Sequence, residues 1–167
     1  MDRFDKLKKM VVNLLMENNP GYAPIGISHL AYSACLCALM ARKRGADMEL
    51  AQTAGYLHDV WLHLNAPYDD EICARHAREG AILAEEIMRR HGGYLDGEIA
   101  VVRRMIENHD FTAREDDAMS EIMKDADMLS HYLNASAAGR EEAFHPRAAA
   151  ALREFGISVE KRDEGMV

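Results

Sequence analysis

The stretch AGYLHDV, residues 54–60, ends a predicted helix with an adjacent histidine and aspartate. Ala54 and Gly55 lie four and three residues before His58, and therefore on the same face of the helix. Side chains this small leave room for a neighbouring helix to approach. If the carboxylate of Asp59 is buried here, it must be paired or bound to a metal, because a bare charge is too costly to bury. The stretch therefore indicates a helical core with polar side chains turned inwards.

Helical periodicity continues on both sides of this stretch, with short breaks rich in Gly, Pro, Asn and Asp. Residues 19–27 are predicted to form a loop through Pro24 and Gly26, followed by Ser28 as a helix N-cap. No segment shows the period-two alternation of a half-buried strand. The sequence thus predicts an all-α fold, a single-domain bundle of about seven helices. We expect these helices over residues 2–18, 28–44, 48–63, 70–90, 96–109, 119–135 and 140–154.

Composition narrows the class of protein. The 167 residues suit one domain, and the net charge of −8 argues against non-specific nucleic-acid binding, which needs a basic surface. An anionic substrate is still compatible with this negative net charge, because bound metal ions can be the largest charges in a site. The polar start Met1-Asp2-Arg3-Phe4 predicts no signal peptide, and we find no apolar run near the ~18 residues of a membrane span. We expect a cytoplasmic protein whose three Cys are buried rather than disulfide-bonded.

Five successive predicted helices each carry a histidine or aspartate that could bind a metal ion. Several have small or apolar neighbours at helical spacing; His109, for example, continues the face of Ile99, Val102 and Ile106. The candidate ligands are His29, His58, Asp59, His76, His109 and Asp127. Ordinary structural roles are expected for the other four histidines, His63, His91, His131 and His145.

The order His29, His58-Asp59, Asp127 resembles that of the HD superfamily of metal-dependent phosphohydrolases. AGYLHDV is similar to the small-residue run that precedes the family's His-Asp pair. The segment DADMLSHY, residues 125–132, resembles its Ala-Asp-x-Leu segment, which places the ligand at Asp127 rather than Asp125.

Two further segments resemble those that supply additional histidines in two-metal members: RHAREGA, residues 75–81, and MIENHD, residues 105–110. The resemblance covers residues 28–135. We expect residues 1–27 to pack on this core as a helix and loop, and residues 136–167 to form a C-terminal helix and a flexible tail.

The resemblance implies one or two divalent metal ions, and nitrogen and oxygen ligands without Cys suit Mn, Fe, Co, Ni or Zn. Asp59 would bridge two ions, and Asp59 and His58 would form the catalytic centre. The implied reaction is hydrolysis of a phosphate monoester or diester by a metal-activated water. We expect a small phosphorylated substrate, a nucleotide. The implied primary site consists of His29, His58, Asp59 and Asp127, and the second of His76 and His109 with Asp59.

The chain departs from the family's pattern in two places. Many members read Ile-Gly-Lys after the His-Asp pair, whereas this chain reads Val60-Trp61-Leu62, so a lysine that could contact a phosphate is missing. Arg75 and His63 are candidates to replace it as substrate-binding residues. Asp110 follows His109 where some members carry another histidine, which weakens the case for a second ion.

Two alternatives stay open: a di-iron oxygenase on the same scaffold, and a non-catalytic sensor of a metal or nucleotide. The complete ligand set argues against the sensor. The loops 19–27, 64–70 and 110–118 are expected to line the pocket. A homodimer and core packing explain the Met- and Ala-rich surfaces equally well.

Overall fold

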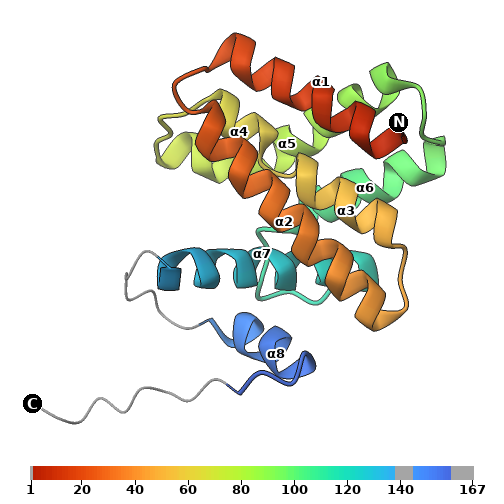
Figure 1. Cartoon of the computed structure of the whole chain (residues 1–167), viewed down its shortest axis with the longest axis vertical. Helices are drawn as coiled ribbons and strands as arrows, with labels where there is room; N and C mark the ends of the chain where they lie inside the picture. Colours follow the sequence, from red (N-terminus) through yellow and green to blue (C-terminus); the bar gives the residue numbers. More distant parts are fainter. Residues whose placement is uncertain (1, 138–144, 159–167) are drawn as a thin grey trace, which may run out of the picture.

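The computed structural model describes residues 2–137 and 145–158, and these residues form eight helices and no strand (Figure 1). The all-α prediction is confirmed. The helices are α1 (Arg3–Asn18), α2 (Ala23–Arg44), α3 (Met48–Leu57), α4 (Val60–Leu64), α5 (Asp70–His91), α6 (Asp96–Asn108), α7 (Ala118–Ala137) and α8 (Pro146–Glu154).

Local sequence signals account for most helix ends. The side chains of Asp47 and Asp69 accept hydrogen bonds from the third backbone N–H beyond them, at 3.0 and 2.9 Å, and so begin α3 and α5. Gly45 and Gly92 end α2 and α5 in the left-handed conformation, with φ of 68° and 72°, which costs glycine little.

The second helix begins earlier than predicted, at Ala23 rather than after Ser28. Pro24 lies in its first turn, where the missing N–H costs nothing and the fixed φ suits a helix. Gly26 is a buried residue of this helix and packs directly on His63. A methyl group at this position would lie 2.7 Å from the His63 ring. Proline and glycine mark close packing at this point, not a loop.

The predicted helix over 48–63 is divided in two at the His-Asp pair. His58 caps α3, and Asp59 (φ −109°, ψ 15°) departs from helical geometry before α4 begins. Adjacent side chains of an uninterrupted helix point about 100° apart, and the break at Asp59 releases this pair from that constraint.

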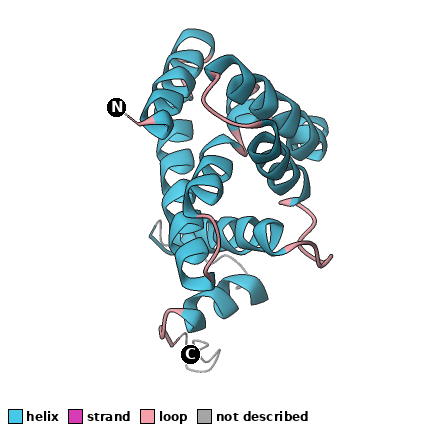
Figure 2. Ribbon diagram, turned by 90° about the vertical axis from the view of Figure 1, so that its right-hand side faces the viewer, coloured by secondary structure: helices cyan, strands magenta, loops and turns pink. Residues whose placement is uncertain are grey.

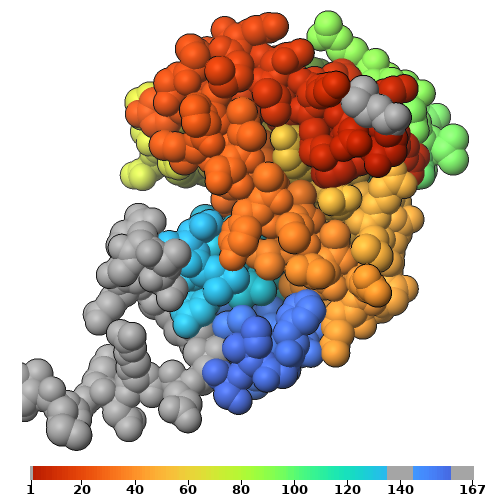
Figure 3. Space-filling view, in the orientation of Figure 1, coloured from red at the N-terminus to blue at the C-terminus, as the bar shows by residue number. Residues whose placement is uncertain are grey.

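The helix α2 crosses the molecule diagonally (Figure 1) and packs chiefly on α3 and α7. Seen from the side, the described elements are helices joined by loops (Figure 2). By length and composition it could span a membrane, which corrects the prediction that no such segment exists. Many of its apolar residues pack inside the bundle instead, since nine residues of this helix are buried. The exposed face of α2 and the outer face of α8 are visible in Figure 3.

Two smaller predictions need correction. Of the cysteines, only Cys37 is buried, whereas Cys35 and Cys73 are exposed. The last helix begins at Pro146, after an N-cap in which the ring of His145 accepts from the Arg147 N–H at 3.2 Å. Residues 140–144 of the predicted last helix, and residues 159–167 of the predicted tail, lie outside the described residues.

Candidate metal centre

All six predicted ligand side chains meet where α2, the α3–α4 junction, α5, α6 and α7 come together. Four of them, His58, Asp59, His109 and Asp127, are buried, and the other two are partly exposed. These side chains face the interior of the bundle, as helical periodicity in the sequence predicted. Their ring nitrogens and carboxylate oxygens form three overlapping groups, each with its atoms within 4.8 Å of one another: His29-His58-Asp59, His58-His109-Asp127 and Asp59-His76-His109.

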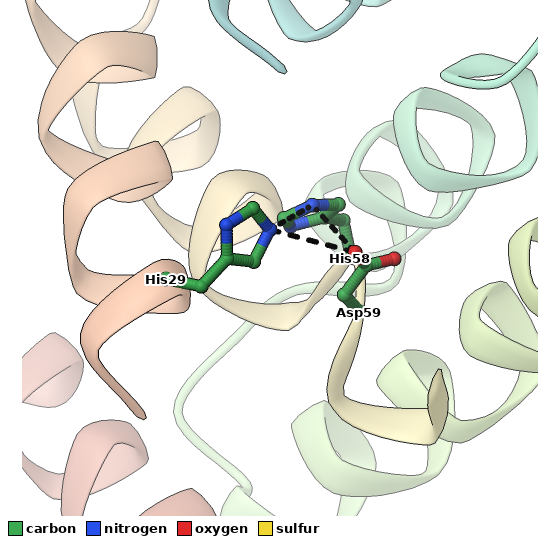
Figure 4. A group of neighbouring side chains, drawn as sticks. All are labelled: His29, His58 and Asp59. Carbon is green, nitrogen blue, oxygen red and sulfur yellow. Dashed lines mark hydrogen bonds and ion pairs between the residues drawn. The ribbon is translucent and has the colours of Figure 1, made fainter. Parts of the chain in front are cut away.

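One half of the cluster is formed by His29, His58, Asp59 and Asp127. His29 reaches from α2 towards the His-Asp pair (Figure 4), and its Nε2 lies 3.2 Å from His58 Nε2 and 3.4 Å from Asp59 Oδ2. His58 Nε2 lies 3.3 Å from Asp59 Oδ2 and 3.3 Å from Asp127 Oδ1. Atoms from three parts of the chain thus surround His58 Nε2.

The other half is formed by His76 and His109. Their Nε2 atoms lie 3.1 Å apart, and each lies 3.8 Å from Asp59 Oδ1. Asp59 therefore presents one oxygen to each half of the cluster. This is the arrangement required of a carboxylate that bridges two ions.

Backbone carbonyls orient three of the imidazoles in the same way. The Nδ1 of His58 lies 3.0 Å from Gly55 O, that of His76 lies 2.5 Å from Cys73 O, and that of His109 lies 2.6 Å from Ile106 O. A carbonyl only accepts, so each Nδ1 must carry the proton and donate it. In the neutral ring, Nε2 then presents a lone pair to the cluster, as metal-binding histidines do.

The cluster is electrostatically incomplete. Lone pairs of facing Nε2 atoms and of two carboxylates converge in a buried space. Asp59 Oδ1 and Asp127 Oδ1 have no hydrogen-bond partner among the described residues. Buried oxygens of this kind are normally satisfied by hydrogen bonds or a metal. The residues therefore fit one or two divalent cations, and their nitrogen and oxygen donors suit Mn, Fe, Co, Ni or Zn.

The metal-free cluster compensates with a proton. Burial alone lowers the pKa of His58, but the carboxylates of Asp59 and Asp127 outweigh it and raise this pKa well above its ordinary value. Burial raises the pKa of Asp59, yet His58 and His29 hold it well below its usual range. Protonated His58 thus supplies the positive charge that a metal ion would bring, and a metal must displace that proton.

Two glycines allow the helices to approach closely enough. A methyl group on Gly80 of α5 would lie 2.7 Å from His58 O, and one on Gly55 of α3 would lie 2.9 Å from the Cα of Ala34. Both contacts are with backbone, which cannot move aside cheaply. The small residues noted in the sequence therefore act as predicted, by allowing helices to pack closely around the cluster.

The two predicted substrate-binding residues have different environments. Arg75 is exposed, pairs with Glu71 at 3.5 Å and Glu79 at 3.4 Å, and lies over the Trp61 ring with its Cζ 6.0 Å from the centroid. The positive charge of Arg75 is therefore paired with carboxylates that do not belong to the ligand cluster. His63, by contrast, is buried, with its ring centroid 5.6 Å from that of His29.

Sequence reasoning missed His131, to which it gave an ordinary structural role. Its Nε2 lies 3.6 Å from Asp127 Oδ2, and its ring centroid lies 5.9 Å from that of His29. The available signal was its position four residues after Asp127, on the same face of α7. Asp125, in contrast, forms ion pairs with Arg44 and Arg147, both at 2.7 Å, which keep it apart from the ligand cluster.

A second buried charge lies three residues before Asp127. Lys124 has no exposed surface, and its ammonium donates to Arg114 O at 2.7 Å, Asp116 Oδ2 at 2.7 Å and Glu121 Oε1 at 2.9 Å. These three hydrogen bonds use all three ammonium protons. The bonds to Arg114 and Asp116 connect the segment that follows His109 to α7, the helix that carries Asp127.

Comparison with known proteins agrees with the geometry. The family model described as HD domain matches residues 26–132, which includes all six ligand positions. No curated protein and no solved structure matches the chain. The match spans well over half of the chain and coincides with the ligand cluster. The chain therefore belongs to the HD-domain superfamily of metal-dependent phosphohydrolases.

Proposed function

We propose that this chain is a metal-dependent phosphohydrolase that cleaves a phosphate monoester or diester of a nucleotide. The observation that carries the proposal is the position of Asp59, whose two oxygens face separate pairs of imidazoles. Proteins of this family are generally hydrolases, which supports the reaction type. The substrate class is our inference.

The proposed ligands are His29, His58, Asp59 and Asp127 for one ion, and His76, His109 and Asp59 for the other. Bound there, divalent ions would activate a water and neutralise charge that develops on the phosphoryl group. The chain's own contribution is orientation. The Gly55, Cys73 and Ile106 carbonyls hold three rings by their Nδ1 protons, and Asp59 joins the two halves.

Charge supports an anionic substrate. Two carboxylates cannot neutralise two divalent cations, so the occupied centre would be positive although the chain is acidic. Phe111, two residues after His109, is exposed, and its ring could stack on a nucleobase. Arg114 already lies over it, 4.9 Å from its centroid, and would be the polar neighbour of such a base.

The decisive experiment is elemental analysis of protein purified without chelator, followed by a phosphatase and nucleotide screen with added Mn²⁺, Co²⁺ or Ni²⁺. We expect bound metal and metal-dependent release of phosphate or of a nucleoside product. Iron with substrate-dependent oxygen uptake would instead indicate the oxygenase. Tight nucleotide binding without turnover would indicate the sensor.

Asp59→Ala tests the assignment of the centre. We expect metal binding and turnover to be lost together, with activity reduced at least ~10³-fold, because both halves lose their shared ligand. His91→Leu is the matched control, since it removes a partly buried imidazole far along α5 from His76. Full activity of Asp59→Ala at unchanged metal content would refute the assignment.

A further inference from the structure

Two imidazoles outside the ligand set adjoin the cluster, both beside His29. His63 comes from α4 and His131 from α7, and their ring centroids lie 5.6 and 5.9 Å from that of His29. These two side chains are therefore the nearest candidates for contact with a molecule bound at the centre.

His63 is buried without its full set of partners. Its side chain is only 7% exposed, and its Nε2 has no hydrogen-bond partner among the described residues. Gly26 leaves the space that the ring occupies, since a methyl group there would lie 2.7 Å from His63 Cγ. A polar atom left unpaired in a closely packed position calls for a partner that the chain does not supply.

His131 stands where the cluster meets solvent. Its side chain is 52% exposed, compared with 15% for His29 and 0% for His58, so the centre opens on the His131 side and closes at His58. Its Nε2 lies 3.6 Å from Asp127 Oδ2, longer than a good hydrogen bond. The ring is placed to turn an N–H towards an entering anion.

Several cationic side chains near the ligands in sequence are already paired. Arg75 contacts Glu71 and Glu79, and Arg114 contacts Asp116. Lys124 has used all three of its protons, as described above. Arg78, two residues after His76, is exposed, and Leu62 stands where many family members carry a lysine. The two imidazoles differ from these cationic side chains because their rings adjoin His29.

We infer that His63 and His131 bind the phosphoryl oxygens of the substrate, on the His29 side of the centre. This inference rests on the proposed function for the identity of the substrate, but not for the binding itself. Both residues are assigned to binding and not to metal ligation. Imidazole N–H groups would donate hydrogen bonds to the phosphoryl oxygens, which only accept.

Binding of inorganic phosphate to the metal-loaded protein, measured by calorimetry, tests the inference directly. His63→Leu and His131→Ala should each weaken phosphate binding about tenfold, as expected for a lost hydrogen bond to a charged group. Metal content should stay unchanged in both. His63→Gln should restore much of the binding, because the amide can replace Nε2 as a donor.

His91→Leu is again the matched control, because His91 Nε2 is also buried without a partner among the described residues. His91 follows His76 by 15 residues on α5, about 22 Å along the helix. This variant should bind phosphate as the parent protein does.

The outcomes separate the two proposals. Unchanged phosphate affinity in both variants, no phosphate binding by the parent protein, or loss of metal from the variants would each overturn the inference, even if the parent hydrolyses esters. Phosphate binding that depends on His63 and His131, in a protein that hydrolyses nothing in the screen, would support the inference and contradict the proposed function.

Discussion

Two clusters of buried charge lie three residues apart on α7, one at Lys124 and one at Asp127, and they are completed in different ways. The Lys124 ammonium has an oxygen for each of its protons, so the chain alone satisfies it. The Asp127 cluster contains two buried carboxylate oxygens without a hydrogen-bond partner among the described residues. The first cluster is complete without a ligand, whereas the second needs a cation. The comparison therefore separates a charge that supports the fold from charges that support function.

The sharpest test of this difference is Asp127→Asn. We expect the protein to lose the ion that His29, His58, Asp59 and Asp127 are proposed to bind, and turnover to fall ~10³-fold. Metal should stabilise the parent protein against urea unfolding but not this variant, because the ions bind only the intact centre. Metal content, turnover and urea unfolding with and without chelator provide the three measurements. Equal stabilisation of both proteins by metal would contradict the contrast.

Lys124→Met should behave in the opposite way. Replacing a fully buried ammonium removes three hydrogen bonds to a charged group, so we expect unfolding to become easier by about 3 kcal/mol. The loss should be similar with metal and with chelator, because the chain itself satisfies this charge. A variant that is destabilised only when metal is present would show that the two clusters act as one.

The packing that brings the ligands together can be tested at Gly80. Gly80→Ala forces a methyl group against His58 O, so we expect a loss of about 1–3 kcal/mol in stability and weaker metal binding. Gly97→Ala on α6 is the control, because nothing lies within 4 Å of the new methyl group. It should stabilise the helix by about 0.5–1 kcal/mol. Equal effects of the two substitutions would exclude a role for close packing at the His-Asp pair.

A further test concerns the pH dependence of metal binding at the cluster. The pKa of His58 is raised above its unfolded value, so its proton stabilises the metal-free fold fully below about pH 6.5 and progressively less as the pH rises through the raised value. A metal must displace this proton, so its affinity should rise by about tenfold per pH unit until His58 is neutral. Metal titrations from pH 6 to 8 at constant ionic strength measure the slope. A flat profile would mean that no proton occupies the centre.

The sequence determined the helices and the identity of the ligands through local physics. Caps such as Asp47 and stops such as Gly45 act within one turn, and helical spacing records which side chains face the core. Helical periodicity therefore predicted the all-α fold and side chains turned inwards, and the order of His29, His58-Asp59 and Asp127, which resembles that of a known family, predicted the candidate cluster.

Only the tertiary structure decided the rest. The break at Asp59, the early start of α2, and the positions of His63 and His131 depend on contacts between segments far apart in the chain. Gly26 reads as a loop residue in the sequence, yet it is a helical residue packed on His63. Periodicity gives the direction of a side chain but not its neighbour. Which ring nitrogens meet which oxygens depends on how closely the helices approach, and Gly55 and Gly80 set that distance.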